Sequence, residues 1–397
     1  MCIRDRGSLD NQQQGRITSK ANLLVSGGAL DNRGGILAAD HNARVVASSL
    51  DNRQGDFYAG RHLDLQLRSA LNNSNGVVRS DGSLTLLAGP VDNSSGGRIR
   101  SVGPLDASMS GLDQLGDGQL LSQSSLALEL YNGHLDNRGG RVNAPGQLLF
   151  KNIGSVDNQT GEISSNLAFS LAAGNLDNRN GKLLSEQAVT LRIARALENA
   201  KGLVSAPVLD IQAGSLGNQA GRLNASDVLN LLVGSGLDNQ SGQILARTTQ
   251  VNSGVLDNRQ GLLQGDHTLN LSSLGSLDNR QGILFAGQVF NLASGSALNN
   301  ANGVVRSDGS LNLLAGPVDN SSGGRIRSVG PLDASVSGLD QHGDGQLLSQ
   351  SSLALDLKYG HLDNQTGRIN APGQLLFKNV GSVDNQAGEI SSNLAFS

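Results

Sequence analysis

The chain has 397 residues and a formal net charge of -4, from 30 Lys and Arg against 34 Asp and Glu. Charged residues make up only 16% of it and hydrophobic residues 37%. So low a charge content excludes a chain held open by charge repulsion, and the acidic balance argues against a dedicated nucleic-acid binder. The single cysteine, Cys2, excludes a disulfide framework and a zinc site built from thiolates. The sequence contains no run of 18 apolar residues, so it predicts no membrane-spanning helix.

Residues 1–8 lie outside the pattern that fills the rest of the chain. The first six, Met-Cys-Ile-Arg-Asp-Arg, are too short and too charged for a signal peptide. We interpret residues 1–8 as an irregular segment whose start is non-native or internal to a longer reading frame. The lack of a signal peptide then carries no information about location.

From residue 9 onward a three-residue word recurs, an apolar residue followed by Asp-Asn, with a Gly four or five residues after the Asp position. Its last position is Asn or Gln in all 19 units, and the mean step is about 20.8 residues. A unit this short cannot bury an apolar face alone and must stack on its neighbours. We therefore predict one repeat array over residues 9–397, truncated at both ends.

Within a unit the side chains alternate with a period of two. Leu63, Leu65 and Leu67 alternate with polar neighbours, and a second short alternating stretch follows the Gly, as at residues 16–19. This period predicts strands, and no stretch shows a helical stripe. The fold class is therefore all-β, a parallel β-helix of about 19 coils of about 20–21 residues. At ~4.8 Å per coil it would form a rod on the order of 90 Å long.

The recurring word predicts a tight corner. Gly would supply a positive φ, and Asn and Asp would tolerate left-handed conformations and bond nearby backbone. Asn side chains repeated at one place in every coil would lie above one another and hydrogen-bond as a ladder. We predict this structural ladder, which is not an active site, at Asn32, Asn52, Asn137, Asn158, Asn178, Asn239, Asn258, Asn279, Asn364 and Asn385.

The residues predict no catalytic, cofactor or metal site. The repeated Asp is read as a turn former, because the nine-residue period of calcium-binding coils is missing. No two of the six His residues have the three- or four-residue spacing of a local zinc motif. There is no Gly-x-Ser-x-Gly elbow in a strand-to-helix context. We expect no enzyme and no cofactor.

A block of the array is duplicated. Residues 71–170 and 298–397 align without gaps, with 88 of 100 positions identical. Each copy holds one irregular coil, at residues 113–118 and 340–345, in which Gln114 or Gln341 replaces Asn and the next step is 23 residues. We expect the extra residues to bulge outward, either as a tolerated insertion or as a contact point for a partner.

The units, for example Gly174-Asn175-Leu176-Asp177-Asn178-Arg179-Asn180-Gly181-Lys182-Leu183, resemble the hemagglutinin repeats of large bacterial exoproteins secreted by the two-partner route. That family includes filamentous-hemagglutinin-type adhesins and the stalks of contact-dependent growth inhibition toxins. The resemblance covers residues 9–397. It implies a right-handed β-helical fibre on the outer surface of a Gram-negative-type cell.

The resemblance also implies partners. An outer-membrane two-partner secretion transporter would act through an N-terminal domain not seen in this sequence, and the fibre would meet a cell-surface receptor or glycan that the sequence does not name. We expect a fibre or stalk segment of an adhesin. The alternatives are the stalk of a growth-inhibition toxin and, more remotely, a carbohydrate-active β-helix enzyme. Uncapped coil ends would expose unpaired strand edges, so we also expect end-to-end self-association.

Overall fold

The computed structural model describes residues 1–4 and 7–394. Residues 5–6, in the segment predicted to be irregular, and residues 395–397, where the last predicted coil breaks off, lie outside the described residues. The chain divides into two compact units, residues 1–198 with 202–206 and residues 199–201 with 207–397. Each unit is an all-β stack of parallel strands, and no described residue belongs to a helix that could cross a membrane.

The first unit consists of short strands with a few longer ones. They are β1 (Cys2–Arg4), β2 (Leu9–Asp10), β3 (Arg16–Ser19), β4 (Leu23–Ser26), β5 (Ala29–Asp31), β6 (Ile36–Ala39), β7 (Ala43–Ala47), β8 (Ser49–Asp51), β9 (Asp56–Ala59), β10 (His62–Leu67), β11 (Leu71–Asn72), β12 (Val77–Ser80), β13 (Ser83–Leu87), β14 (Pro90–Asp92), β15 (Arg98–Ser101), β16 (Leu105–Ser108), β17 (Gly111–Asp113), β18 (Gln119–Ser122), β19 (Leu126–Asp136), β20 (Arg141–Ala144), β21 (Leu148–Asp157), β22 (Glu162–Ser165), β23 (Phe169–Ala173), β24 (Asn175–Asp177), β25 (Lys182–Ser185) and β26 (Ala188–Glu198).

The division between the units falls within β27 (Leu203–Gly217). The second unit begins with long strands and returns to short ones. Its strands are β28 (Arg222–Asp238), β29 (Gln243–Asp257), β30 (Leu262–Ser273), β31 (Leu277–Asp278), β32 (Ile283–Ala286), β33 (Val289–Ser294), β34 (Leu298–Asn299), β35 (Val304–Ser307), β36 (Ser310–Leu314), β37 (Pro317–Asp319), β38 (Arg325–Ser328), β39 (Leu332–Ser335), β40 (Gly338–Asp340), β41 (Gln346–Ser349), β42 (Leu353–Asp356), β43 (His361–Asp363), β44 (Arg368–Ala371), β45 (Leu375–Lys378), β46 (Ser382–Asp384) and β47 (Glu389–Ser392).

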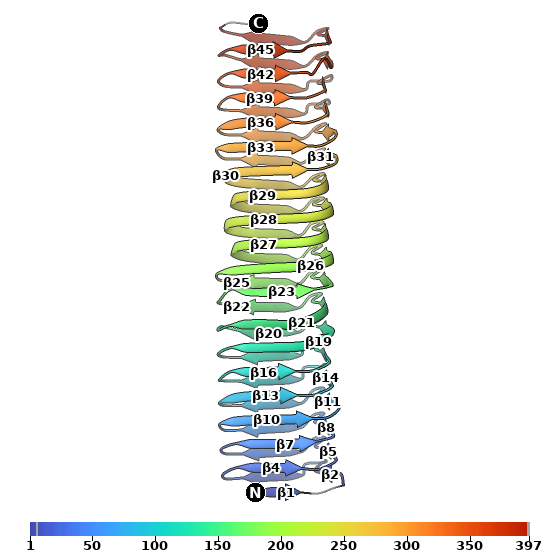
Figure 1. Ribbon diagram of the computed structural model, residues 1–397, viewed down its shortest axis with the longest axis vertical. Coiled ribbons are helices and arrows are strands. Elements are labelled where there is room, and N and C mark those ends of the chain that lie inside the picture. Colours follow the sequence, from blue (N-terminus) through green and yellow to red (C-terminus); the bar gives the residue numbers. More distant parts are fainter. Residues whose placement is uncertain (5–6, 395–397) are drawn as a thin grey trace. The chain divides into compact units, whose positions relative to one another are not determined.

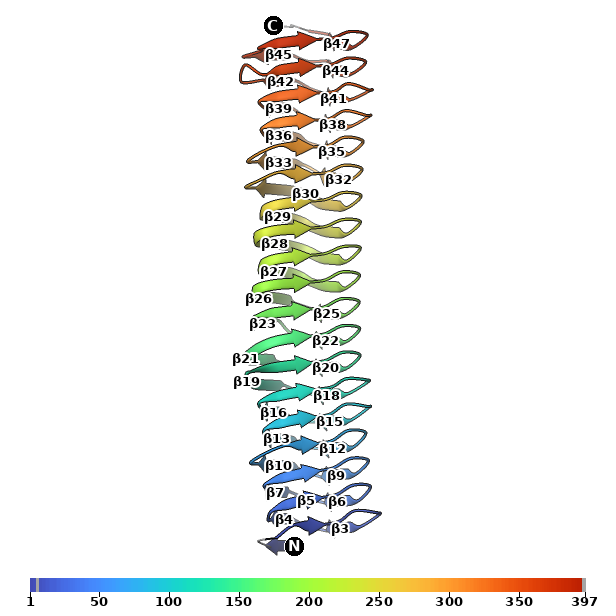
Figure 2. The same cartoon turned by 90° about the vertical axis from the view of Figure 1, so that its right-hand side faces the viewer.

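A regular coil holds three strands, and each strand pairs in parallel with its equivalent in the next coil. β6, β7 and β8 form one such coil and pair with β9, β10 and β11. Within each unit the coils follow one another in sequence order, with the first strands of successive coils in one column (Figures 1 and 2). This is the predicted parallel β-helix, of about 18 turns in all.

Two sequence expectations need correction. Each coil was expected to hold two strands. The apolar residue and Asp of the repeated word form a third, short strand, as in β8. Two or three residues are too few to show an alternating pattern, so the sequence does not predict this strand. In addition, residues 2–4 of the segment expected to be irregular form β1, which pairs with β4 from Cys2↔Leu24 to Arg4↔Ser26.

The core consists of stacked columns of aliphatic side chains. The apolar residue of the word points inward in each coil, and Leu30, Leu50 and Leu71 are at most 2% exposed. Phe57 and Phe290 are the largest fully buried side chains. Full burial of one such side chain contributes roughly 1.5–3 kcal/mol, and a coil can collect this only from the coils above and below it. Inter-coil packing therefore stabilises the fold, and no coil is stable alone.

Buried serines at the turns are satisfied by backbone. Ser80, Ser122 and Ser349 lie at the end of the first strand of their coils and are at most 3% exposed. The Ser80 hydroxyl donates to the carbonyl of Arg61 at 2.9 Å, and that of Ser122 to the carbonyl of Gly103 at 2.9 Å. Alanine occupies the equivalent place in other coils, as at Ala39. A small side chain is therefore required there, and a hydroxyl is tolerated because it finds a backbone acceptor.

The corner glycine differs from its predicted role. Left-handed φ falls on the residue before it, such as Gln54 (φ 58°), Thr160 (56°) and Lys201 (56°). The glycine itself is needed for close approach, because a Cβ on Gly35 would lie 2.0 Å from the carbonyl oxygen of Asn11 in the preceding coil. Neither the corner Asn nor its Asp is left-handed. Glycine thus recurs because two backbones meet there.

This difference can be tested at two adjacent glycines. Gly35→Ala should destabilise the first unit by about 2–3 kcal/mol or more, since a methyl group cannot fit against backbone. Gly34 has φ +60° and nothing within 4 Å of an added Cβ, so Gly34→Asn should cost less than about 1 kcal/mol. Thermal and urea unfolding of both variants measure the difference. Equal losses, or a larger loss for Gly34→Asn, would contradict the close-approach explanation.

Candidate functional site

The predicted corner amides lie in one column in each unit, and all of them are buried except Asn385, which is exposed. Asn32 Nδ2 donates to Asn52 Oδ1 at 2.7 Å, and Asn52 Nδ2 donates to Asn73 Oδ1 at 2.8 Å. In the second unit the same bond joins Asn239, Asn258 and Asn279 at 2.7 Å. All these side chains are 0% exposed. Each Nδ2 also faces a backbone carbonyl, as Asn258 does with Gly261 at 3.2 Å, so each amide is used on both sides.

The remaining predicted amides occupy the same column. Asn137 donates to Asn158 at 2.6 Å and Asn158 to Asn178 at 2.7 Å. Asn364 donates to Asn385 at 2.6 Å. No ligand could reach the buried part of this column without opening the coils, so its geometry fits a structural element.

The two glutamine corners keep the column continuous. Gln114 accepts from Asn93 at 3.2 Å and donates to Asn137 at 2.9 Å, and Gln341 makes the same two contacts with Asn320 and Asn364 at 3.1 and 3.2 Å. The corner from Gln114 to Gly118 has one residue more than that from Asn32 to Gly35, but so has the corner from Asn93 to Gly97, where Asn stays in the column. Corner length alone therefore does not explain the two glutamines.

The other extra residue of the irregular coil lies away from the corner. Tyr131 and Asn132 adopt positive φ in the first copy, as Lys358 and Tyr359 do in the second. The side chains of Tyr131 and Tyr359 are 57% and 78% exposed. The expected outward bulge is therefore split between two turns.

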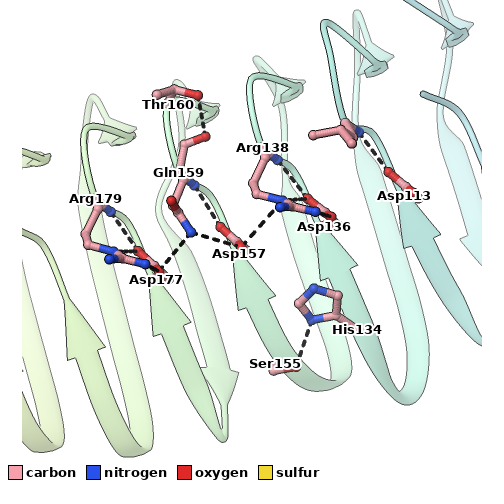
Figure 3. A network of polar contacts seen from close by, with 11 residues as sticks. Asp113, His134, Asp136, Arg138, Ser155, Asp157, Gln159, Thr160, Asp177 and Arg179 are labelled. Atoms are coloured by element: carbon pink, nitrogen blue, oxygen red, sulfur yellow. Dashed lines mark hydrogen bonds and ion pairs between the residues drawn. The ribbon is translucent and has the colours of Figure 1, made fainter. Parts of the chain in front are cut away.

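The Asp of each word lies on the outside of the corner. Asp177 Oδ1 accepts from the backbone N–H of Arg179 at 3.0 Å, an Asx turn, and the Arg179 guanidinium donates to both carboxylate oxygens. Figure 3 shows Asp113, Asp136, Asp157 and Asp177 in successive coils. The backbone N–H two residues on closes each turn by donating to the carboxylate, and this closure is the structural use of the predicted turn-forming Asp.

These pairs shift the pKa of their carboxyl groups. Partial burial raises the pKa of Asp278, but hydrogen bonds and charge from Arg280 outweigh it, and the net shift is downward. Asp136 behaves in the same way beside Arg138. A shift arising from one neighbouring cation is the mark of a surface ion pair, whereas a catalytic carboxyl is usually tuned by several groups in a cleft.

Two successive coils bring together three potential metal ligands. Asp340, His342 and Asp363 each place a ligand atom within 4.8 Å of the others, and the hydrogen bond that the His342 imidazole donates to Asp340 raises the pKa of His342. Both aspartates are corner carboxylates already engaged by backbone N–H groups. In the other copy of the block Leu115 stands in place of His342. We therefore assign these side chains to the corner.

Three His–Ser pairs join neighbouring coils. His134 Nδ1 lies 2.8 Å from Ser155 Oγ, His361 Nδ1 lies 2.8 Å from Ser382 Oγ, and His62 Nδ1 lies 2.7 Å from Ser83 Oγ. A nucleophilic serine also needs a group that orients the histidine and donors for an oxyanion. Within the part of the chain that the structure describes, none of these three imidazoles is hydrogen-bonded to a carboxylate. The arrangement supports inter-coil contacts and not acyl transfer.

A wide hollow lies on the outer face of the second unit. It encloses about 550 Å³ along β29, β30, β33, β36, β39, β42 and β45. Asn270, Asn291 and Asn312 stand in register there, and each Nδ2 donates to the Oδ1 of the preceding Asn at 2.8 Å. We call this surface the amide groove. Its lining comprises Gln250, Asn252, Asn270, Leu271, Ser272, Asn291, Leu292, Ala293, Asn312, Leu313, Leu314, Asp333, Ala334, Ser335, Ala354, Asp356 and Lys378.

Two smaller hollows accompany it. One of about 220 Å³ in the second unit is lined by Arg306, Arg327 and Arg368, of which Arg306 is paired with Asp308 and Arg368 with Glu389. Another of about 150 Å³ lies in the first unit, between Asp106, Glu129 and Lys151. Its residues are the block equivalents of Asp333, Asp356 and Lys378 at one end of the amide groove.

Sequence reasoning did not predict the amide groove, although the sequence carries a signal for it. Asn270, Asn291 and Asn312 recur every 21 residues at the outward position of an alternating strand. Aligning the outward columns in the same way as the inward ones would have revealed the second ladder. Its hollow shape could not be read in this way, because it depends on short neighbours such as Ser272 and Ala293.

Comparison with known proteins agrees with this architecture. The family model for the haemagglutinin repeat matches residues 208–281 and 284–394. Neither the comparison with curated proteins nor that with solved structures finds a match.

The buried ladder and its outer neighbour should differ in energetic weight. Asn258→Ala removes an amide bonded to Asn239 and Asn279, so the Nδ2 of Asn239 and the Oδ1 of Asn279 each lose one buried hydrogen-bond partner, which should cost roughly 1–3 kcal/mol. Arg259→Ala removes only half-exposed ion pairs with Asp257 and Asp278 and should cost less than about 1 kcal/mol. Unfolding by heat or urea compares the two variants. A loss for Arg259→Ala as large as that for Asn258→Ala would contradict the structural importance of the ladder.

The Asp–Arg pairs should make stability depend on acid. Because the pKa of Asp278 is lowered in the fold, the Arg280 pair stabilises above the unfolded pKa of about 3.9, and this contribution disappears as the pH falls through the folded pKa. Arg280→Met should therefore lower the melting temperature slightly at pH 7 and not at pH 2. Arg222, whose side chain bonds neutral Asn224, is the control, and Arg222→Met should show no such pH dependence. An Arg280→Met deficit that persists at pH 2 would contradict the assignment.

Proposed function

We propose, from the haemagglutinin repeats that residues 208–281 and 284–394 carry, that this chain is a non-catalytic fibre segment of a large adhesin exposed on a bacterial surface or secreted from it. The repeat family and the β-solenoid point to a structural stalk. Export by the two-partner route and a surface location are part of the proposal. They are supported by the repeat type, which is typical of such exoproteins.

The observation that favours an adhesin over a passive stalk is the amide groove. A stalk that only carries an effector needs coils that stack, and the buried ladder and aliphatic columns suffice for that. The exposed carboxamides bond between coils, but stacking does not require the lateral hollow of about 550 Å³ beside them. Such a concave surface with convergent polar groups is the usual form of a binding site. The coils themselves therefore offer a place for contact with another surface.

Adhesion by the purified chain tests the proposal. Fluorescent beads coated with the folded chain should bind bacterial or host cells saturably, and excess soluble chain should compete. Beads coated with heat-unfolded chain are the control for non-specific sticking. Folded-chain beads that bind no better than the unfolded control would overturn the adhesin and favour a passive stalk, provided circular dichroism shows the β-structure intact on the soluble chain.

A further inference from the structure

We propose that the amide groove binds a linear, uncharged polysaccharide that lies along the stack, across the coils from β29 to β45. The inference rests on the proposed adhesive function and names the ligand class of its lateral surface. It is argued from the hydrogen-bonding capacity of the groove, the spacing of its amides, its charge and its shape.

The exposed ladder keeps half of its hydrogen-bonding capacity for a ligand. A primary carboxamide has two N–H donors and two acceptor lone pairs. Asn291 uses one donor toward Asn270 and one lone pair toward Asn312. The second donor and the second lone pair of each amide remain, and Asn291 and Asn312 are exposed. A hydroxyl both donates and accepts, so a row of sugar hydroxyls can use both groups at every step.

The spacing of the row distinguishes ligand classes. Paired strands place equivalent residues ~4.8 Å apart, so the amides repeat at that distance along the stack. A pyranose unit in an extended glycan advances the chain by a similar length, which allows one sugar per coil. An extended polypeptide advances about 3.3 Å per residue and loses register with the row within a few residues.

The charge of the groove favours a neutral ligand. Its charged lining residues are Asp333, Asp356 and Lys378. Asp356 and Lys378 are register partners in adjacent strands and compensate each other. Asp333 follows Asn312 in the same column and faces solvent. A carboxylate at the end of the amide row accepts hydroxyl donors and repels an acidic polymer.

The second column of the groove supplies room and an apolar contact. It runs through Ser272, Ala293, Leu314 and Ser335 in successive strands. The short side chains leave space beside the amide row, and Leu314 is 52% exposed there. Sugar rings present C–H faces between their hydroxyls, and a half-exposed leucine offers such a face an apolar partner.

The duplicated block provides a natural comparison. In the first unit Thr85 stands at the position of Asn312, and the corresponding hollow is only about 150 Å³. Glu129 replaces Asp356 there, beside Lys151. The same coil geometry thus occurs without the amide row, and the groove depends on the outward side chains and not on the β-helix as such.

The test measures binding of oligosaccharides to the full chain by calorimetry. Two neutral probes, cellohexaose and the hexamer of β-1,4-linked N-acetylglucosamine, are compared with hexagalacturonate and with an uncharged twelve-residue peptide. At least one neutral hexasaccharide should bind, and its trisaccharide should bind at least tenfold more weakly because it reaches fewer coils. No binding by either neutral hexamer at millimolar concentration, or tighter binding of the acidic sugar or the peptide, overturns the proposal.

Two variants locate the site. Asn291→Ala combined with Asn312→Ala should weaken hexasaccharide binding at least tenfold, and Ala293→Phe should block the space beside the row. Asn230 is the matched control, because it is exposed on the same face in β28 and outside the groove. An equal loss with Asn230→Ala, or full binding by both groove variants, overturns the assignment. If beads coated with the groove variants still adhere to cells, the groove is not the adhesive surface, but the chain can still be an adhesin. If the chain binds sugar but no cells, the groove binds its ligand and the adhesin proposal is wrong.

Discussion

The fold depends on a hydrogen bond between two side-chain amides in successive coils. Each coil must return its corner to the same place, and the buried carboxamide fixes that place because it donates to one neighbour and accepts from the other. An aliphatic side chain would fill the space without setting the register. A charged one would be buried at a cost of several kcal/mol. Asn satisfies this constraint in most coils, and Gln satisfies it at Gln114 and Gln341.

The other residues of the corner follow from that bond. Because the amide column brings backbones together, the residue opposite it must lack a Cβ, which explains Gly35 and its equivalents. The outward carboxylate then closes the turn by accepting the N–H two residues on. The left-handed position between them faces solvent and accepts Gln, Thr, Lys or Ala as well as Gly. A left-handed backbone costs an ordinary residue of order 1–2 kcal/mol of conformational free energy. In nearly every coil the surrounding contacts offset this cost.

The sequence was informative where a side chain faces inward, because an inward position is constrained by the same neighbours in every coil. The Leu columns and the Asn ladder could be predicted for this reason. The role of glycine was predicted wrongly, since a conserved spacing of Gly does not distinguish positive φ from close approach. The third strand was missed because Leu50 and its neighbours are too few to show a period. The amide groove was not predicted because an outward side chain is expected to face solvent. Only a comparison of the outward positions of successive coils shows that the Asn side chains form a row.

The same physics explains why this fold can carry a binding surface without losing stability. The inward columns leave little freedom, and the two copies of the block are nearly identical there. Most differences between the copies fall on the outside, as where Thr85 corresponds to Asn312 or Tyr131 to Lys358, and buried differences such as Val142 to Ile369 stay aliphatic. An outward substitution in a strand does not disturb the ladder, because the two sets of side chains lie on opposite faces of the sheet. A few outward changes in register are then enough to turn a repetitive face into a row of hydrogen-bonding groups, and their spacing is set by the stack itself.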